Sequence, residues 1–256
     1  MTEQLLTLFP GEHVCVLRLN RPESYNALSV ELVDALREAV ASVPGSQARV
    51  LVLAANGPGF CSGADLRQRK TMTNDQKYAH NRAINALVNE IADCPIPTIA
   101  ALNGHAVGGG CELALACDIR FAASNAKIGL TEARIGAMPG AGGSQRLPRL
   151  IGTARALEMM FSGEPVSAEK AGEWGLVNGI ISPDALDDHV MSFARLLASR
   201  SRKTTSLLKK AVYQGMDRSL AEGLELERRA IVEVLASSDY AEGLAAFAER
   251  RAPVFQ

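Results

Sequence analysis

The stretch Pro97–Gly143, PTIAALNGHAVGGGCELALACDIRFAASNAKIGLTEARIGAMPGAGG, carries two glutamates beside two glycine clusters. The glutamates are Glu112 and Glu132, and the clusters are Gly108–Gly110 and Gly140–Gly143. A glycine cluster that opens a helix brings backbone N–H groups close to a ligand and aims them at negative charge. Two carboxylates in different surroundings can divide acid and base duties, because burial and hydrogen bonding separate their pKa values. The stretch therefore predicts a site for an anionic intermediate.

Apolar runs of strand length alternate with helical patterns on the N-terminal side of this stretch. Val14–Asn20, Val50–Ala54 and Ile96–Leu102 are short, apolar and typical of buried strands. Helical spacing of leucines after Ser29, and a T-x-x-Q capping box that begins at Thr73, predict helices between them. Strands separated by helices and glycine loops indicate an α/β fold with largely buried sheets.

The chain changes character after residue 181, where only helical patterns follow. Capping-box spacing predicts helix starts at Ser219 and Asp239. We therefore divide the chain into an α/β core, residues 1–181, and an all-helical region, residues 182–256. The helical region must bury its apolar stripe on the core or on a neighbour. Four of its residues are expected to pack: Leu220, Leu224, Ile231 and Leu235.

Composition and charge exclude several classes of partner. Lysine and arginine number 27 against 28 acidic residues, so no basic excess attracts nucleic acid or an anionic membrane. Five cysteines form an odd count without paired spacing, which favours reduced thiols. The N-terminal segment MTEQLLTLFPGEHV carries Glu3 and lacks the basic start of a signal or transit peptide, and no stretch approaches a membrane span. We expect a cytoplasmic protein without a membrane partner.

Other site chemistries lack their characteristic residues. The fingerprints G-x-x-x-x-G-K-[ST] and G-x-G-x-x-G are missing, and the four histidines lack metal-ligand spacing, so neither a nucleotide cofactor nor a metal is expected. A covalent cysteine mechanism is an alternative, since Cys111 follows the first glycine cluster and a helix N-terminus can lower a thiol pKa. His105 would be the nearby base. On residues alone, this alternative stays open beside the Glu112/Glu132 pair.

Four segments, in this order along the chain, resemble the signature segments of the enoyl-CoA hydratase/isomerase (crotonase) family. They are RPESYNAL (21–28), FCSGADL (60–66), NGHAVGGGCEL (103–113) and TEARIGAMPGAGGSQRL (131–147). The resemblance implies a core of repeated ββα units that form a superhelix, with an all-helical C-terminal region for oligomerisation and active-site cover. It also implies a homotrimer or homohexamer that acts on an acyl-CoA thioester. Because the substrate carries coenzyme A, no separate cofactor is expected.

The resemblance implies site residues where the motifs match. Glu112 and Glu132 would be catalytic, and the backbone N–H groups of Ala64 and Gly109 would form an oxyanion hole. Hydration of an enoyl thioester builds enolate charge on the thioester oxygen, which fixed N–H donors stabilise. One glutamate would take a proton from water while the other delivers a proton to the α-carbon, and we expect Glu112 to be the base. The expected substrate-binding residues are Ala27, Asp65, Leu66, Arg67, Gly140 and Arg250.

The expected substrate-binding residues have different parts to play. Arg67 and Arg250 are candidates for the CoA phosphates, because Pro58 stands where the family often has a lysine. Gly140 would leave room for the acyl group beside Glu132. Either arginine could equally be a solvated surface charge.

Two further segments resemble the branch of the family that contains methylglutaconyl-CoA hydratase. They are GADLRQRKTM (63–72) and CELALACDIRFAASNAK (111–127), and they imply a short or branched enoyl-CoA. The animal member of that branch also binds AU-rich RNA, but the matching helix here, SVELVDALREAV (29–40), is acidic to neutral, so nucleic acid is not expected. Both glutamates favour a hydratase. The alternatives are an isomerase of the same family and a non-catalytic RNA-binding or scaffold protein.

Overall fold

The computed structural model describes residues 3–9, 11 and 13–256. The sequence prediction that the N-terminal segment is no targeting peptide rests in part on residues outside this range, namely Met1, Thr2, Pro10 and Glu12. Within the described ranges, no helix is both long enough and apolar enough to cross a membrane.

The main sheet has six strands in the order β1-β2-β3-β5-β7-β10. All neighbours are parallel except β1, which pairs antiparallel with β2. The strands are β1 Leu5–Leu8, β2 Val14–Leu19, β3 Val50–Ala55, β5 Thr98–Leu102, β7 Ile119–Ala123 and β10 Gly179–Ile181. The buried strands expected from the apolar runs are therefore confirmed, whereas β1 was not predicted because its four residues show no distinct pattern.

A second sheet of four strands lies in the order β4-β6-β8-β9. Its strands are β4 Gly59–Cys61, β6 His105–Val107, β8 Lys127–Gly129 and β9 Val166–Ser167. The chain alternates between the sheets, so that β3-β4, β5-β6 and β7-β8 each send one strand to the large sheet and the next to the small one. Helices follow these pairs, which confirms the expected ββα repeat. Sequence patterns had indicated only glycine loops at 59–61 and 105–107, because three-residue strands flanked by glycine are too short for a periodic signal.

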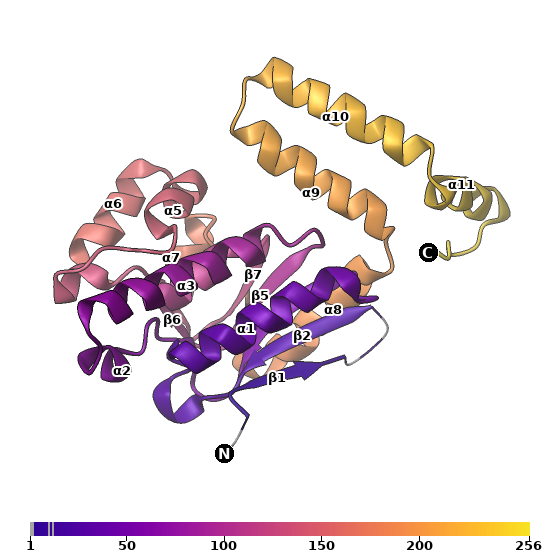
Figure 1. Cartoon of the computed structure of the whole chain (residues 1–256). Coiled ribbons are helices and arrows are strands. Elements are labelled where there is room, and N and C mark those ends of the chain that lie inside the picture. Colours follow the sequence, from indigo (N-terminus) through magenta and orange to yellow (C-terminus); the bar gives the residue numbers. More distant parts are fainter. Residues whose placement is uncertain (1–2, 10, 12) are drawn as a thin grey trace.

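Helices cover both faces of the large sheet (Figure 1). One face packs against α1 (Val30–Ser42) and α3 (Asn74–Ala92), whose leucines join a core cluster with Leu17 and Leu51. The other face packs Val16 and its neighbours against α8 (Leu186–Ala198). Strands buried on both faces explain their continuous apolar sequence. The division at residue 181 remains a prediction, and α8, on its C-terminal side, is part of this core.

The remaining helices lie around the small sheet or beyond the core. Helices α4 (Gly109–Ala116) and α7 (Ala168–Glu173) contact strands of the small sheet, α5 (Gly143–Ile151) packs on α4, and α6 (Thr153–Ser162) packs on α5. The short helix α2 (Leu66–Lys70) follows β4 along the chain. Those that project from the core as an arm are α9 (Arg202–Met216), α10 (Leu220–Leu235) and α11 (Ser238–Glu249), as Figure 1 shows.

The arm leaves open only one of the two expected ways to bury its apolar stripe, which is packing on a neighbour. Helices α9 and α10 contact each other, yet neither contains a buried residue. The exposed fraction is 47–79% for the four residues expected to pack: Leu220, Leu224, Ile231 and Leu235. In the single chain their apolar face has no partner among the described residues.

Most predicted helix caps are confirmed and one is wrong. Ser29 caps α1, and complete capping boxes open α3 at Thr73 and α10 at Ser219. Asp239 does not cap α11. Ser237 begins that helix earlier, because its hydroxyl accepts the Tyr240 N–H, and the buried Asp239 carboxylate instead accepts the Ser201 hydroxyl at 2.5 Å.

Candidate active site

Two glycine-containing loops meet at the N-terminus of α4. Gly63 has a φ of +87°, and a Cβ built there would lie 2.8 Å from the Gly109 nitrogen. A Cβ on Gly110 would lie 2.1 Å from the Cys61 carbonyl oxygen, so no side chain fits between β4 and α4. A Cβ on Gly109 would lie 3.6 Å from the Ala64 nitrogen. The glycines therefore bring the backbone of Ala64 next to that of Gly109.

Both of these backbone N–H groups are free to meet a ligand. Gly109 is the first residue of α4, where an N–H has no partner within the helix. The Ala64 N–H has no hydrogen-bond partner in the described part of the chain. Two unpaired donors that lie side by side at a helix N-terminus are suited to hold a negatively charged oxygen.

Glu112 lies in the first turn of α4 and is 3% exposed. Its Oε1 accepts the Ala141 N–H at 2.7 Å and the Gly143 N–H at 2.8 Å. Burial raises the Glu112 pKa above its ordinary value, although these two hydrogen bonds oppose the shift. The second glycine cluster therefore directs N–H groups at Glu112, not at the ligand, which corrects the simplest interpretation of the sequence.

Glu132 begins a short 3₁₀ helix, Glu132–Ile135. Burial, and then the nearby Glu112, raise its pKa to about 7, against the hydrogen bonds to backbone that lower it. Its Oε2 is buried and has no hydrogen-bond partner within the described ranges. A Cβ on Gly108 would lie 3.5 Å from Glu132 Oε1, in ordinary van der Waals contact, so this glycine lies directly beside the carboxyl. Glu132 is thus the carboxyl better able to keep a proton near neutral pH.

A cavity of about 520 Å³ brings most of the predicted site residues together. Six of them line it: Ala64, Leu66, Gly109, Glu112, Glu132 and Gly140. Four do not: Ala27, Asp65, Arg67 and Arg250. Ala27 and Asp65 are buried. Arg67 is exposed on α2, and Arg250 lies at the C-terminal end of α11 on the arm.

The cavity contains charged residues that the sequence did not single out. Arg69, Lys127 and Arg134 line it, and Arg134 pairs with Glu164. Arg69 could have been found from the sequence, since it stands three residues after Leu66 and side chains at i and i+3 share a helix face.

Gly140 contacts a neighbour that the sequence did not indicate. A Cβ there would lie 2.4 Å from Asn81 Nδ2, so this glycine makes room for a side chain of α3.

The cysteine alternative lacks the chemistry that it needs. Cys111 is fully buried, and burial, followed by the charges of Glu112 and Glu132, raises its thiol pKa far above the ordinary value. A thiol in these surroundings stays protonated and is a poor nucleophile. Across residues 3–9, 11 and 13–256, no three histidine, cysteine or acidic side chains gather in a group that could hold a metal ion.

Two carboxyls and two free N–H donors around one cavity define a class of acid–base enzymes that stabilise an anionic intermediate. The family model for enoyl-CoA hydratase/isomerase matches residues 10–256. The chain belongs to this family.

Individual relatives agree with the family match. The chain is 39% identical to enoyl-CoA hydratase domain-containing protein 2 of Mus musculus, a mitochondrial protein, over 96% of this chain and 85% of that protein. It is also 39% identical to the mitochondrial methylglutaconyl-CoA hydratase of Rattus norvegicus, over 95% and 79%. The crystal structure of an enoyl-CoA hydratase from Bacillus anthracis superposes with a TM-score of 0.97, at 38% identity and 99% coverage of both chains.

Proposed function

We propose that this protein is an enoyl-CoA hydratase, which adds water across the α,β double bond of an enoyl-CoA thioester. One observation carries the proposal: Glu112 and Glu132 line the same cavity as the unpaired N–H groups of Ala64 and Gly109. Hydration needs an acid, a base and a place for enolate charge, and this cavity offers all three. An isomerase shuttles one proton and can use a single carboxyl, so the pair favours the hydratase.

In the proposed reaction, Glu112 is the base. Its Oε1 is held by two backbone N–H groups, which leaves Oε2 to orient a water molecule and accept its proton. The water oxygen bonds to the β-carbon as the double bond's electrons move to the thioester oxygen. That oxygen accepts hydrogen bonds from Ala64 and Gly109, and protonated Glu132 then delivers its proton to the α-carbon. Proton transfer from Glu112 to Glu132 through exchange with solvent resets the site.

The two glutamates must be in opposite protonation states, and this requirement predicts the pH dependence of kcat/KM. Hydration needs ionised Glu112 and protonated Glu132, and the Glu132 pKa is about 7. Activity is therefore expected to decline above about pH 7, as the acid is lost, and to decline on the acid side at a pH above the ordinary glutamate value, because burial also raises the Glu112 pKa. Initial rates between pH 5 and 9 measure this profile. A rate that keeps rising to pH 9 contradicts the assignment of Glu132 as the acid.

The acyl group that we propose is short or branched and carries a terminal carboxylate, as in a methylglutaconyl-CoA-like substrate. Arg69 lines the cavity and is half-buried, and its Nε donates to the neutral side chain of His80 at 3.3 Å. Burial lowers the His80 pKa, followed by the charge of Arg69. The two terminal nitrogens of Arg69 have no partner elsewhere in the described chain. A planar guanidinium with an unused fork is suited to a carboxylate.

We expect the substitution Arg69→Met to raise KM for 3-methylglutaconyl-CoA by about tenfold to a hundredfold, the size of one lost charge-assisted hydrogen bond. KM for crotonyl-CoA, which has no second carboxylate, should change little. A kinetic panel of enoyl-CoA thioesters measures both values. Lys70→Met is the matched control, because Lys70 is exposed on the same helix and does not line the cavity. Equal effects of Arg69→Met on both thioesters contradict the proposed acyl group.

We also propose that the protein assembles as a homotrimer or homohexamer and acts in the cytoplasm. The uncovered apolar face of α9 and α10 supports assembly, since such a face needs a partner. The five free cysteines, all buried, suit a reducing compartment.

Arg67 and Arg250 remain candidates for binding the CoA phosphates. RNA binding is not proposed, because α1 is acidic to neutral and offers RNA no basic surface.

A further inference from the structure

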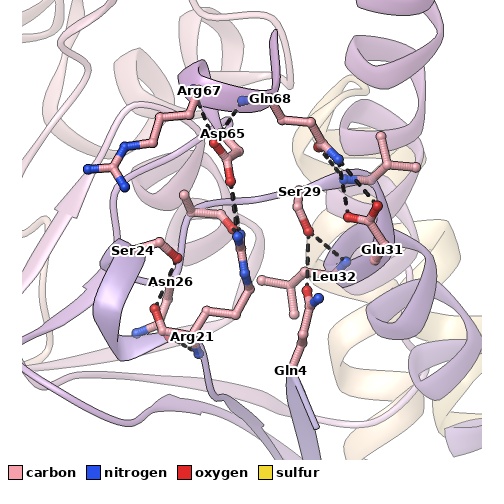
Figure 2. A network of polar contacts seen from close by, with 12 residues as sticks. Gln4, Arg21, Ser24, Asn26, Ser29, Glu31, Leu32, Asp65, Arg67 and Gln68 are labelled. Carbon is pink, nitrogen blue, oxygen red and sulfur yellow. Dashed lines mark hydrogen bonds and ion pairs between the residues drawn. The ribbon is translucent and has the colours of Figure 1, made fainter. Parts of the chain in front are cut away.

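The segment RPESYNAL (21–28) lies behind the cavity, and none of its residues lines it. Figure 2 shows its main contact, in which the Arg21 guanidinium reaches Asp65. Both terminal nitrogens of Arg21 donate to Asp65 Oδ2 at 3.1 Å, and one also donates to the Ala27 carbonyl at 2.5 Å. The side chains of this ion pair are 17% and 9% exposed. Asp65 directly follows Ala64, the proposed oxyanion donor.

The other oxygen of Asp65 fixes the start of α2. Asp65 Oδ1 accepts the N–H groups of Arg67 and Gln68, both at 3.1 Å, as an N-cap does (Figure 2). Burial alone would raise the Asp65 pKa, but the Gln68 N–H and the Arg21 guanidinium outweigh burial and hold the pKa below its ordinary value. The carboxylate therefore stays charged and connects α2 to Arg21.

The backbone on both sides of Ala64 is held by one residue of the same segment. The Leu28 N–H donates to the Gly63 carbonyl at 2.8 Å, and the Asp65 N–H donates to the Leu28 carbonyl at 3.1 Å. These two bonds form a parallel bridge between Leu28 and Ala64. The Ala64 N–H is left unpaired in the described chain, and Ala64 lines the cavity. This N–H belongs to the same peptide as the Gly63 carbonyl, so the Leu28 bond sets its direction. Arg21 holds Leu28 in place from both sides, because it donates to the Ala27 carbonyl and to the Asp65 carboxylate.

We propose that Arg21 is a positioning residue for catalysis: by pairing with Asp65 it holds the Ala64 peptide at the angle that the oxyanion requires. This inference rests on the proposed function. A displacement of about 1 Å at such a donor can cost about a hundredfold in rate, so a pair that touches no substrate can still control kcat.

A purely structural role explains the pair less well. The segment is already anchored by the fully buried Asn26, whose Nδ2 donates to the carbonyls of Asn56 and Gly59, each at 2.9 Å. Asn26 Oδ1 also accepts the Arg21 N–H at 2.8 Å. A buried ion pair is in general weak support for stability, because desolvation of both charges offsets their attraction. Asn26 therefore holds the segment in place even without the ion pair, and the pair refines the position of the backbone at Ala64.

The test uses Asp65→Asn, in which the amide oxygen keeps the cap while the charge is lost. A second variant, Arg21→Met combined with Asp65→Asn, removes both charges and leaves neither buried alone. Arg37→Met is the control, because it breaks another arginine–carboxylate pair, the more exposed one with Glu90, which does not line the cavity. The readouts are kcat and KM for crotonyl-CoA, the Tm, and the ultraviolet red shift of a bound aryl enoyl-CoA, which reports hydrogen bonds to the thioester carbonyl.

We expect both Asp65 variants to lose about tenfold to a hundredfold in kcat, with KM nearly unchanged and a smaller red shift. Arg37→Met should retain wild-type kcat and red shift. Folded Asp65 variants with the kcat and red shift of the control would overturn the inference while leaving the hydratase proposal intact, and so would an Asp65→Asn variant that cannot fold. A wild-type protein without hydratase activity would overturn the proposed function and this inference with it.

Discussion

Substitution of Glu112 by glutamine is expected to lower kcat for hydration of crotonyl-CoA by about 10²–10⁴-fold, the usual contribution of a general base. The amide keeps the shape of the side chain, and its oxygen can still accept the N–H groups of Ala141 and Gly143. It cannot take a proton from water, however. Glu132→Gln should have a loss of similar size, because it removes the proton donor. Loss of the conjugated-thioester absorbance measures both rates.

The control for these variants is Glu90→Gln. Glu90 is a half-buried glutamate of α3 that pairs with Arg37 and does not line the cavity, so its substitution should leave kcat unchanged. Circular dichroism and Tm show whether each variant is folded. Wild-type rates in folded Glu112→Gln and Glu132→Gln proteins would refute the assignment of the acid–base pair.

Removal of the Gly109 N–H should be almost as severe. Gly109→Pro deletes this donor at the first position of α4, where proline is well tolerated in a helix. We expect kcat to fall by about 10²–10³-fold, the cost of one lost oxyanion-hole donor. Steady-state hydration of crotonyl-CoA gives kcat, and the Tm should stay close to that of the wild type because no hydrogen bond within α4 is lost.

Gly109→Ala is the companion variant, since it adds a methyl group but keeps the N–H. A Cβ there meets Gly63, Leu28 and Ala64 only at 3.4–3.6 Å, which is ordinary van der Waals contact. This variant should therefore retain much more activity than Gly109→Pro. If the two variants lose the same activity, the effect comes from the added atoms and not from the missing donor.

The sequence predicted the large elements well because their signals are local. Continuous apolar runs indicated β3 and β5, and capping boxes marked the starts of α3 and α10. The sequence pattern did not indicate strands β4 and β6 of the small sheet, since their pairing joins residues more than forty positions apart. Asp239 was wrongly predicted to be a cap because its capping-box spacing is a local signal. Its actual partner, Ser201, is distant in the chain.

The candidate site was predicted in part. Motif positions indicated both glutamates and both N–H donors, which the structure brings to one cavity. The sequence could not show that the cluster Gly140–Gly143 serves Glu112, because this follows from two hydrogen bonds across 29 and 31 residues. Nor could it show that Asp65 joins Arg21 to α2 and does not line the cavity. Its expected part in substrate binding stays a prediction.

The most direct test of the central claim is to mix the purified protein with crotonyl-CoA and follow the absorbance of the conjugated thioester. If Glu112, Glu132 and the two N–H donors form a hydratase site, the absorbance falls at a rate proportional to enzyme concentration, and the product is the 3-hydroxyacyl thioester. Absence of hydration with crotonyl-CoA and with every other short, branched or aryl enoyl-CoA would contradict the account.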